Sequence, residues 1–179
     1  MQIKNHILQD VRFLRSPNFN ERPLNAEISL LVIHSISLPP KKYNTNHIEN
    51  FFLNKLDASL DDFYQEIKDL KVSAHILIKR SGEVIQFVPF NMRAWHAGDS
   101  SFENNDNCND YSIGIELEGS DDDIFEDIQY SKLKLITSKL MQEYTFINKN
   151  NIKGHSEIAP GRKSDPGNLF NWERYLNGL

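Results

Sequence analysis

The chain has 179 residues, of which 39% are hydrophobic and 25% are charged, and its formal net charge is −5. This length suits one domain that buries its own core without crosslinks. The negative charge argues against a nucleic-acid-binding protein, which would carry a basic surface. The single cysteine, Cys108, excludes an internal disulfide bond and fits a reducing compartment.

The N-terminal segment does not look like a targeting sequence. Lys4, Asp10 and Arg12 interrupt every apolar run in residues 1–15, so no signal peptide is predicted. No stretch approaches the roughly 18 apolar residues that a membrane helix needs. We therefore expect a cytoplasmic monomer without a nucleic-acid or membrane partner.

The first half of the chain predicts a strand, two helices and a hairpin. The apolar run at 29–33 predicts a buried strand that ends at His34. Residues 47–70 show partial helical spacing, and the acidic stretch within them, 57–62, indicates a break between two helices. Residues 73–88 alternate on both sides of Ser81 and Gly82, as in a hairpin.

The second half alternates loops with regular elements. Residues 91–111 are polar and predict a long loop, of the kind that often binds ligands. Residues 112–118 alternate like a strand, and 128–146 carry an apolar helical stripe with Asp127 as the expected N-cap. Residues 152–168 predict a loop, and 171–176 a last short helix. We expect an α/β fold in which helices flank a mixed central sheet, as one domain over residues 1–179.

Three residues far apart in the chain could form a metal site. His34, His155 and Asp165 would supply two imidazoles and one carboxylate, a donor set that leaves the fourth position of a catalytic zinc ion open to water. Spacing alone is weak support, because most histidines in proteins are hydrogen-bonded core residues.

Two further charged residues have both an ordinary and a catalytic interpretation. Glu116 lies on the polar side of the strand at 112–118, which could be an exposed strand face or could hold a general base. Lys163 stands two residues before Asp165. It could be a solvated loop lysine or could stabilise a developing oxyanion.

Four segments together carry a family resemblance: LLVIHSISLPP, VSAHILIKRSGEVIQFVPFNMRAWHAG, CNDYSIGIELEG and GHSEIAPGRKSDPG. From about residue 28 to the C-terminus they resemble, in order, the amidase-2 family, which is related to the peptidoglycan recognition proteins and the T7 lysozyme amidase. Aspartate at position 165 resembles the cytoplasmic members that act on 1,6-anhydro-N-acetylmuramyl-L-alanine, since phage and recognition-protein amidases usually have cysteine there.

The resemblance implies a fold and a reaction. The fold would be that of the recognition proteins and T7 lysozyme. One Zn²⁺ per chain would be held by His34, His155 and Asp165, with Glu116 and Lys163 as the catalytic pair. The reaction would hydrolyse the amide between (1,6-anhydro-)N-acetylmuramic acid and L-alanine of small peptidoglycan fragments, during cell-wall recycling.

The resemblance also implies substrate-binding residues. Trp95 and His96 match a motif that lines the groove, although Trp95 could equally be core. Three positions depart from the family pattern: Ser35 replaces asparagine, and Lys71 and Asn107 replace arginines that would meet the stem peptide and its carboxylates. Lysine acts as a point charge where arginine grips a carboxylate with two hydrogen bonds, so affinity for the peptide end should differ.

Three other functions remain open. A non-catalytic peptidoglycan-binding module would have lost a zinc ligand. A cysteine peptidase would pair Cys108 with His96. An exported autolysin or phage lysin would act on intact wall. Three observations favour the cytoplasmic zinc amidase: the zinc ligands are retained, no activating helix lies beside Cys108, and there is no signal peptide.

The preferred peptide length is not predicted. His75 also matches the family, and its place in a predicted strand indicates a buried, hydrogen-bonded histidine.

Overall fold

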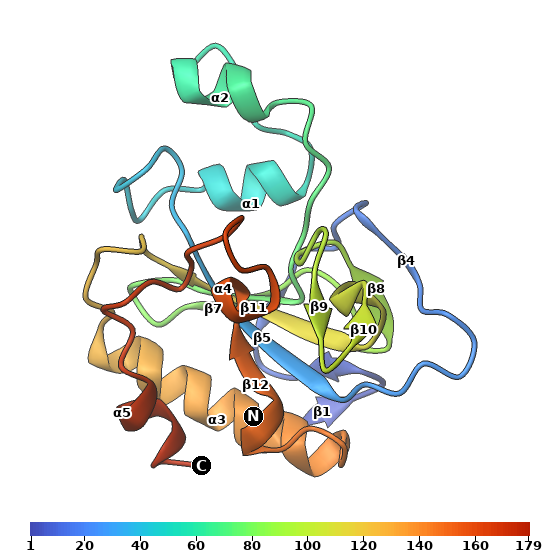
Figure 1. Ribbon diagram of the computed structural model, residues 1–179. Coiled ribbons are helices and arrows are strands. Elements are labelled where there is room, and N and C mark those ends of the chain that lie inside the picture. The colour runs from blue at the N-terminus through green and yellow to red at the C-terminus, as the bar shows by residue number, and fades with distance from the viewer.

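The centre of the computed structural model, which describes residues 1–179, is a six-stranded mixed sheet (Figure 1). In sheet order the strands are β12 (Ile152–Gly154), β5 (Leu30–Ile36), β11 (Ser112–Glu118), β6 (Ile76–Ile78), β7 (Val84–Gln86) and β3 (Arg12–Phe13). The first four run parallel, β7 is antiparallel to β6, and β3 is parallel to β7. The predicted α/β fold with a mixed central sheet is confirmed.

Helices lie on both sides of this sheet. In Figure 1, α3 (Asp127–Glu143) and α5 (Trp172–Leu176) lie below it, and α1 (His47–Phe52) and α2 (Asp62–Ile67) lie above. One apolar cluster joins the sheet to α3 and α5, and another packs around α1 and α2. The break predicted between two helices in residues 47–70 is confirmed. None of the helices combines the length and apolar character of a membrane span.

The alternation of side chains in β5 and β11 gives the sheet a core side and a polar side. Alternate residues of both strands join the cluster between the sheet and α3: Leu31, Ile33, Ile113, Ile115 and Leu117. Because successive side chains of a strand point to opposite faces, His34 and Glu116 face away from α3. These two residues are register partners in the parallel β5–β11 pair. The sheet therefore places an imidazole and a carboxyl group side by side.

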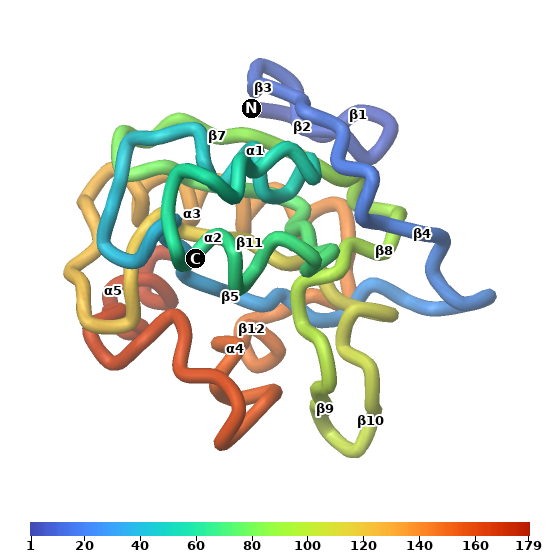
Figure 2. Tube along the Cα trace, turned by 90° about the horizontal axis from the view of Figure 1, so that it is seen from above, coloured from blue at the N-terminus to red at the C-terminus, as the bar shows by residue number.

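Short strand pairs and turns complete the fold. β1 (Ile3–Lys4) pairs with β2 (Ile7–Leu8), β4 (Phe19–Glu21) with β8 (Met92–Ala94), and β9 (Ser101–Phe102) with β10 (Asn105–Asp106). Single 3₁₀ turns occupy Cys108–Asp110 and Lys149–Asn151, and α4 (His155–Ile158) directly follows β12. The β9–β10 hairpin projects from the body of the molecule in Figure 2.

Several local predictions agree with the structure. The hairpin appears as β6 and β7, and its turn contains Gly82 with φ +84°. A side chain there would also collide with Ile128, since an added Cβ would lie 2.4 Å from Cγ1. The strand predicted at 112–118 is β11, and the last short helix is α5.

Other predicted boundaries were wrong, and for β5, β8 and β12 the reason is that pairing partners distant in sequence set them. The strand expected to end at His34 runs to Ile36, since its pairing with β11 continues to Glu118. The predicted loop 91–111 contains β8, β9 and β10, and the predicted loop 152–168 contains β12 and α4. The long helix begins at Asp127, not after it, and ends at Glu143; Gln129 accepts a hydrogen bond from the backbone N–H of Glu126 just outside its start.

Candidate metal and catalytic site

Three donor atoms converge on the polar side of the sheet. His34 comes from β5, His155 begins α4, and Asp165 follows in the C-terminal loop. The two Nδ1 atoms are 3.0 Å apart, and each lies 3.1 Å from Oδ2 of Asp165. Ligands about 2.0–2.1 Å from a tetrahedral zinc ion stand about 3.3 Å apart, so this nearly equilateral triangle needs little adjustment to hold one. The donor types and geometry fit a zinc ion.

The far side of each imidazole is also hydrogen-bonded. Nε2 of His155 lies 3.0 Å from the carbonyl oxygen of Ala97, which can only accept, so Nε2 carries the proton and Nδ1 keeps its lone pair. Nε2 of His34 lies 2.9 Å from Nδ1 of His96, whose own Nε2 is 3.2 Å from Oγ of Ser112. Outer hydrogen bonds of this kind fix the tautomer and ring orientation of metal-binding histidines.

The electrostatics favour the forms of these groups that bind metal. Burial lowers the pKa of His34 to about 4, so this imidazole is neutral at pH 7. Burial on its own would raise the pKa of Asp165, but its contacts with the imidazoles of His155 and His34 outweigh this effect and hold that pKa below its usual range. A neutral imidazole beside an ionised carboxylate is a ready ligand set for a divalent cation.

Glu116 lies beside this triangle with an unused oxygen. The side chain is 8% exposed, and Oε2 has no hydrogen-bond partner in the protein. Burial first, and then the charge of Asp165, raise the pKa of Glu116 well above its usual value, while Lys163 acts to lower it. A carboxyl group with a raised pKa is a stronger proton acceptor when ionised, as a general base requires.

These groups open onto one cavity of about 210 Å³. Its polar lining includes the three candidate ligands, Glu116 and Lys163, and its apolar lining is Ile36, Phe51, Phe52, Leu70, Val72 and Trp95. A pocket with an apolar wall and a few convergent polar groups is the usual form of a small-molecule site.

Comparison with known proteins identifies the family. The N-acetylmuramoyl-L-alanine amidase family model matches residues 24–168. The chain belongs to this family. It is 48% identical over 177 residues to 1,6-anhydro-N-acetylmuramyl-L-alanine amidase AmpD of Haemophilus influenzae, covering 99% of this chain and 96% of the relative. The sequence-based expectation of an amidase is confirmed.

Solved structures agree with the assignment of this chain to the amidase family. A crystal structure of a selenomethionine derivative of AmpD superposes with a TM-score of 0.97 at 44% identity, covering 100% of this chain and 99% of the other. A complex of Escherichia coli AmiD with anhydro-N-acetylmuramic acid-L-Ala-D-γ-Glu-L-Lys has a TM-score of 0.62 at 28% identity and covers 90% of this chain and 65% of that one.

The residues expected to bind substrate in this amidase do not all reach the cavity. Ser35, Trp95 and His96 line it, whereas Lys71 and Asn107 do not. Both of the latter are exposed, and Asn107 directly follows the β9–β10 hairpin with φ +57°. Any contact of Lys71 or Asn107 with substrate would involve a part that extends beyond the cavity.

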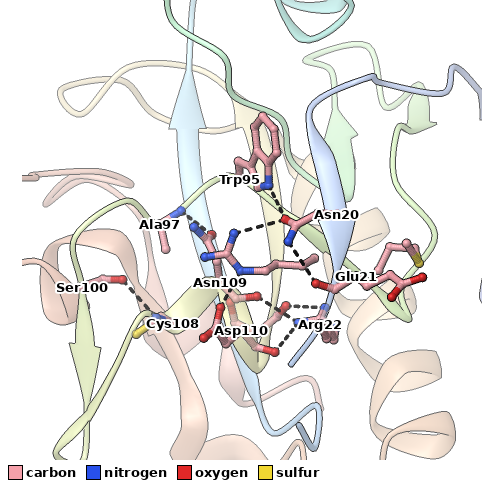
Figure 3. Close-up of polar contacts among 12 residues, drawn as sticks. Asn20, Glu21, Arg22, Trp95, Ala97, Ser100, Cys108, Asn109 and Asp110 are labelled. Carbon is pink, nitrogen blue, oxygen red and sulfur yellow. Dashed lines mark hydrogen bonds and ion pairs between the residues drawn. The ribbon is translucent and has the colours of Figure 1, made fainter. Parts of the chain in front are cut away.

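The three residues that do line the cavity have other partners as well. Ser35 Oγ donates to Oδ1 of Asp121 at 3.1 Å, and Trp95 Nε1 donates to Oδ1 of Asn20 at 2.7 Å (Figure 3). His96 has both ring nitrogens engaged, by His34 and Ser112, which leaves neither of them free for substrate.

Two other expectations concern residues near the site. His75 is fully buried; its Nδ1 accepts from the backbone N–H of Gly114 at 3.0 Å, and its Nε2 lies 3.1 Å from the carbonyl oxygen of Met92. Cys108 is also fully buried and does not line the cavity. Its Sγ lies 3.3 Å from the hydroxyl of Tyr111, so nothing in its surroundings favours a cysteine nucleophile.

Proposed function

We propose that this amidase uses one zinc ion to hydrolyse the bond between (1,6-anhydro-)N-acetylmuramic acid and L-alanine in small peptidoglycan fragments. The observation that carries the zinc proposal is the triangle of His34, His155 and Asp165 donor atoms at 3.0–3.1 Å. The similarity to the 1,6-anhydro-N-acetylmuramyl-L-alanine amidase of H. influenzae and the substrate bound in the AmiD complex support this choice of substrate.

Zinc at such a site supplies a Lewis acid that polarises a carbonyl and lowers the pKa of water. Around it, Glu116 accepts the proton of the attacking water through its unpaired Oε2. Lys163 lines the same cavity, and its ammonium stabilises the negative charge that develops on the carbonyl oxygen. Glu116 then donates its proton to the alanine nitrogen as the C–N bond breaks, which leaves a lactyl carboxylate and a free peptide.

The apolar wall suits the rest of this substrate. Phe51, Phe52 and Trp95 line the same cavity as the charged groups and would pack against the methyl groups of the lactyl and alanine units. They would also exclude water, which strengthens the electrostatic effect of Lys163. Lys71 and Asn107 would contact the stem peptide only outside the cavity.

A role in recycling wall fragments in the cytoplasm, by a monomeric enzyme, is part of this proposal. The test compares anhydromuramyl-tripeptide with intact sacculi as substrates and identifies the products by mass spectrometry. We expect release of the tripeptide from the small substrate and little release from sacculi. Equal release from both would overturn the fragment preference, and no release from either would overturn the reaction.

Metal dependence is tested on the same fragment. Chelation should abolish hydrolysis and added zinc should restore it, while His34→Ala should lose both bound zinc and activity. Full activity of metal-free protein would contradict the zinc proposal.

A further inference from the structure

Asn109 is a buried asparagine next to the candidate metal site, in the 3₁₀ turn between β10 and β11. It is 6% exposed. Its Oδ1 accepts two hydrogen bonds from consecutive backbone N–H groups, that of His96 at 3.0 Å and that of Ala97 at 2.9 Å. Figure 3 shows the Asn109 side chain turned toward Ala97. One amide oxygen thus fixes the backbone of a two-residue segment.

Those two residues make the outer contacts of both imidazole ligands. The ring of His96 meets Nε2 of His34 at 2.9 Å, and the carbonyl oxygen of Ala97 meets Nε2 of His155 at 3.0 Å. A shift of this segment would therefore disturb both histidines together. Arg162 also donates to Ala97 O, at 2.6 Å, but Arg162 is an exposed loop residue and forms no hydrogen bond with His96.

The turn that carries Asn109 is itself firmly held. Arg22 donates through Nη1 to the carbonyl oxygens of Asn109 and Asp110, both at 3.0 Å (Figure 3). Through Nη2 it donates to the carbonyl oxygen of Ser112 at 2.8 Å. Ser100 Oγ accepts from the backbone N–H of Cys108 at 3.2 Å. The support therefore runs from Arg22 through Asn109 to the two ligand histidines.

We propose that Asn109 is a positioning residue of the metal site, whose amide oxygen sets the orientation of both His34 and His155. This inference rests on the proposed zinc site. Residues that orient metal ligands from outside typically change metal affinity or activity by about 10–100-fold when they are removed. Asn109 acts on two ligands through one atom, so its acceptor oxygen should matter more than its volume.

The experiment measures zinc affinity of metal-stripped protein by competition with a chromogenic chelator. Asn109→Leu keeps the approximate size of the side chain and removes the acceptor, and its zinc Kd should rise by about 10–100-fold. Asn109→Asp keeps an acceptor oxygen in the same place and should bind zinc close to wild type. Asn150→Leu is the matched control, since Asn150 is exposed and lies in the other 3₁₀ turn.

The outcomes separate the two proposals. If wild type binds no zinc, the proposed metal site fails. If wild type binds zinc and Asn109→Leu, shown to be folded by urea denaturation, binds it equally well, only the role of Asn109 fails. Equal losses in Asn109→Leu and Asn109→Asp would also overturn it. If Asn109→Leu does not fold, Asn109→Ser takes its place, because the shorter hydroxyl cannot accept from both N–H groups.

Discussion

Gly114 gives the sharpest test of how the sheet supports the site. A Cβ added at this position would lie 2.5 Å from both Cγ and Nδ1 of the His96 ring, whereas ordinary contacts begin near 3.4 Å. The strand cannot retreat, because Gly114 N–H donates to His75 on one side and β11 pairs with β5 on the other. In Gly114→Ala the His96 ring must therefore move away from His34 and Ser112.

The size of the effect follows from these contacts. Overpacking a core costs about 1–3 kcal/mol, and each of the two ring hydrogen bonds contributes about 0.5–1.5 kcal/mol. Gly114→Ala should lower the free energy of unfolding by about 2–6 kcal/mol and weaken zinc binding. Urea denaturation of metal-free protein measures the first effect, and chelator competition measures the second.

A double-mutant cycle with His96→Ala isolates the cause. Without the imidazole ring, the new methyl group has room, so Gly114→Ala should cost less than about 0.5 kcal/mol in that background. If the cost is the same with and without the His96 side chain, the collision is not the reason, and glycine is needed at position 114 for its backbone alone.

Two further predictions concern Glu116 and His75. Glu116→Gln should keep wild-type zinc affinity and lose roughly 10²–10⁴-fold in kcat, because the amide cannot transfer the proton; zinc loss comparable to that of His34→Ala would show instead that Glu116 is a ligand. Burial first, and then the charge of Arg22, lower the pKa of His75 to about 3. Between pH 6.5 and pH 3 the unfolded chain therefore binds a proton that the folded chain does not, so the free energy of unfolding falls as the pH falls. Between pH 7.5 and pH 5, His75 should lower the free energy of unfolding of metal-free protein by about 2 kcal/mol. Over the same pH range, the loss of stability in His75→Asn should be smaller than in wild type by about this amount. Identical pH dependence of urea denaturation in the two proteins would contradict this interpretation.

The parts of the fold predicted from sequence are those with a local pattern. The alternation in 112–118, the Ser81–Gly82 turn and the apolar stripe of the long helix each depend on neighbours within a few residues. β12 has no such pattern, since it exists through pairing with β5, about 120 residues earlier. The N-terminal strands β1–β4 were likewise not predicted, because each is two or three residues long.

The same distinction applies to the candidate site. His34 and His155 gave weak evidence by themselves, and only the family motifs pointed to a common metal. The polar side of β11 looked like a solvent face, yet Glu116 and Glu118 are buried, because segments from other parts of the chain cover it. Asn109 lies within a family motif, but its proposed role depends on backbone groups 12 and 13 residues earlier that no periodicity reveals.

The pairing of His34 with Glu116 has a consequence for which parts of such an enzyme can vary during evolution. Neighbouring strands of a sheet stand about 4.8 Å apart, so the distance between the proposed metal ligand His34 and the proposed proton-transfer group Glu116 is set by the backbone ladder of β5 and β11. His155 and Asp165 approach from a single helical turn and from the loop that follows it, and loops tolerate insertions more easily than paired strands do. Loops around the cavity can thus diversify and alter what is bound while His34 and Glu116 keep their spacing.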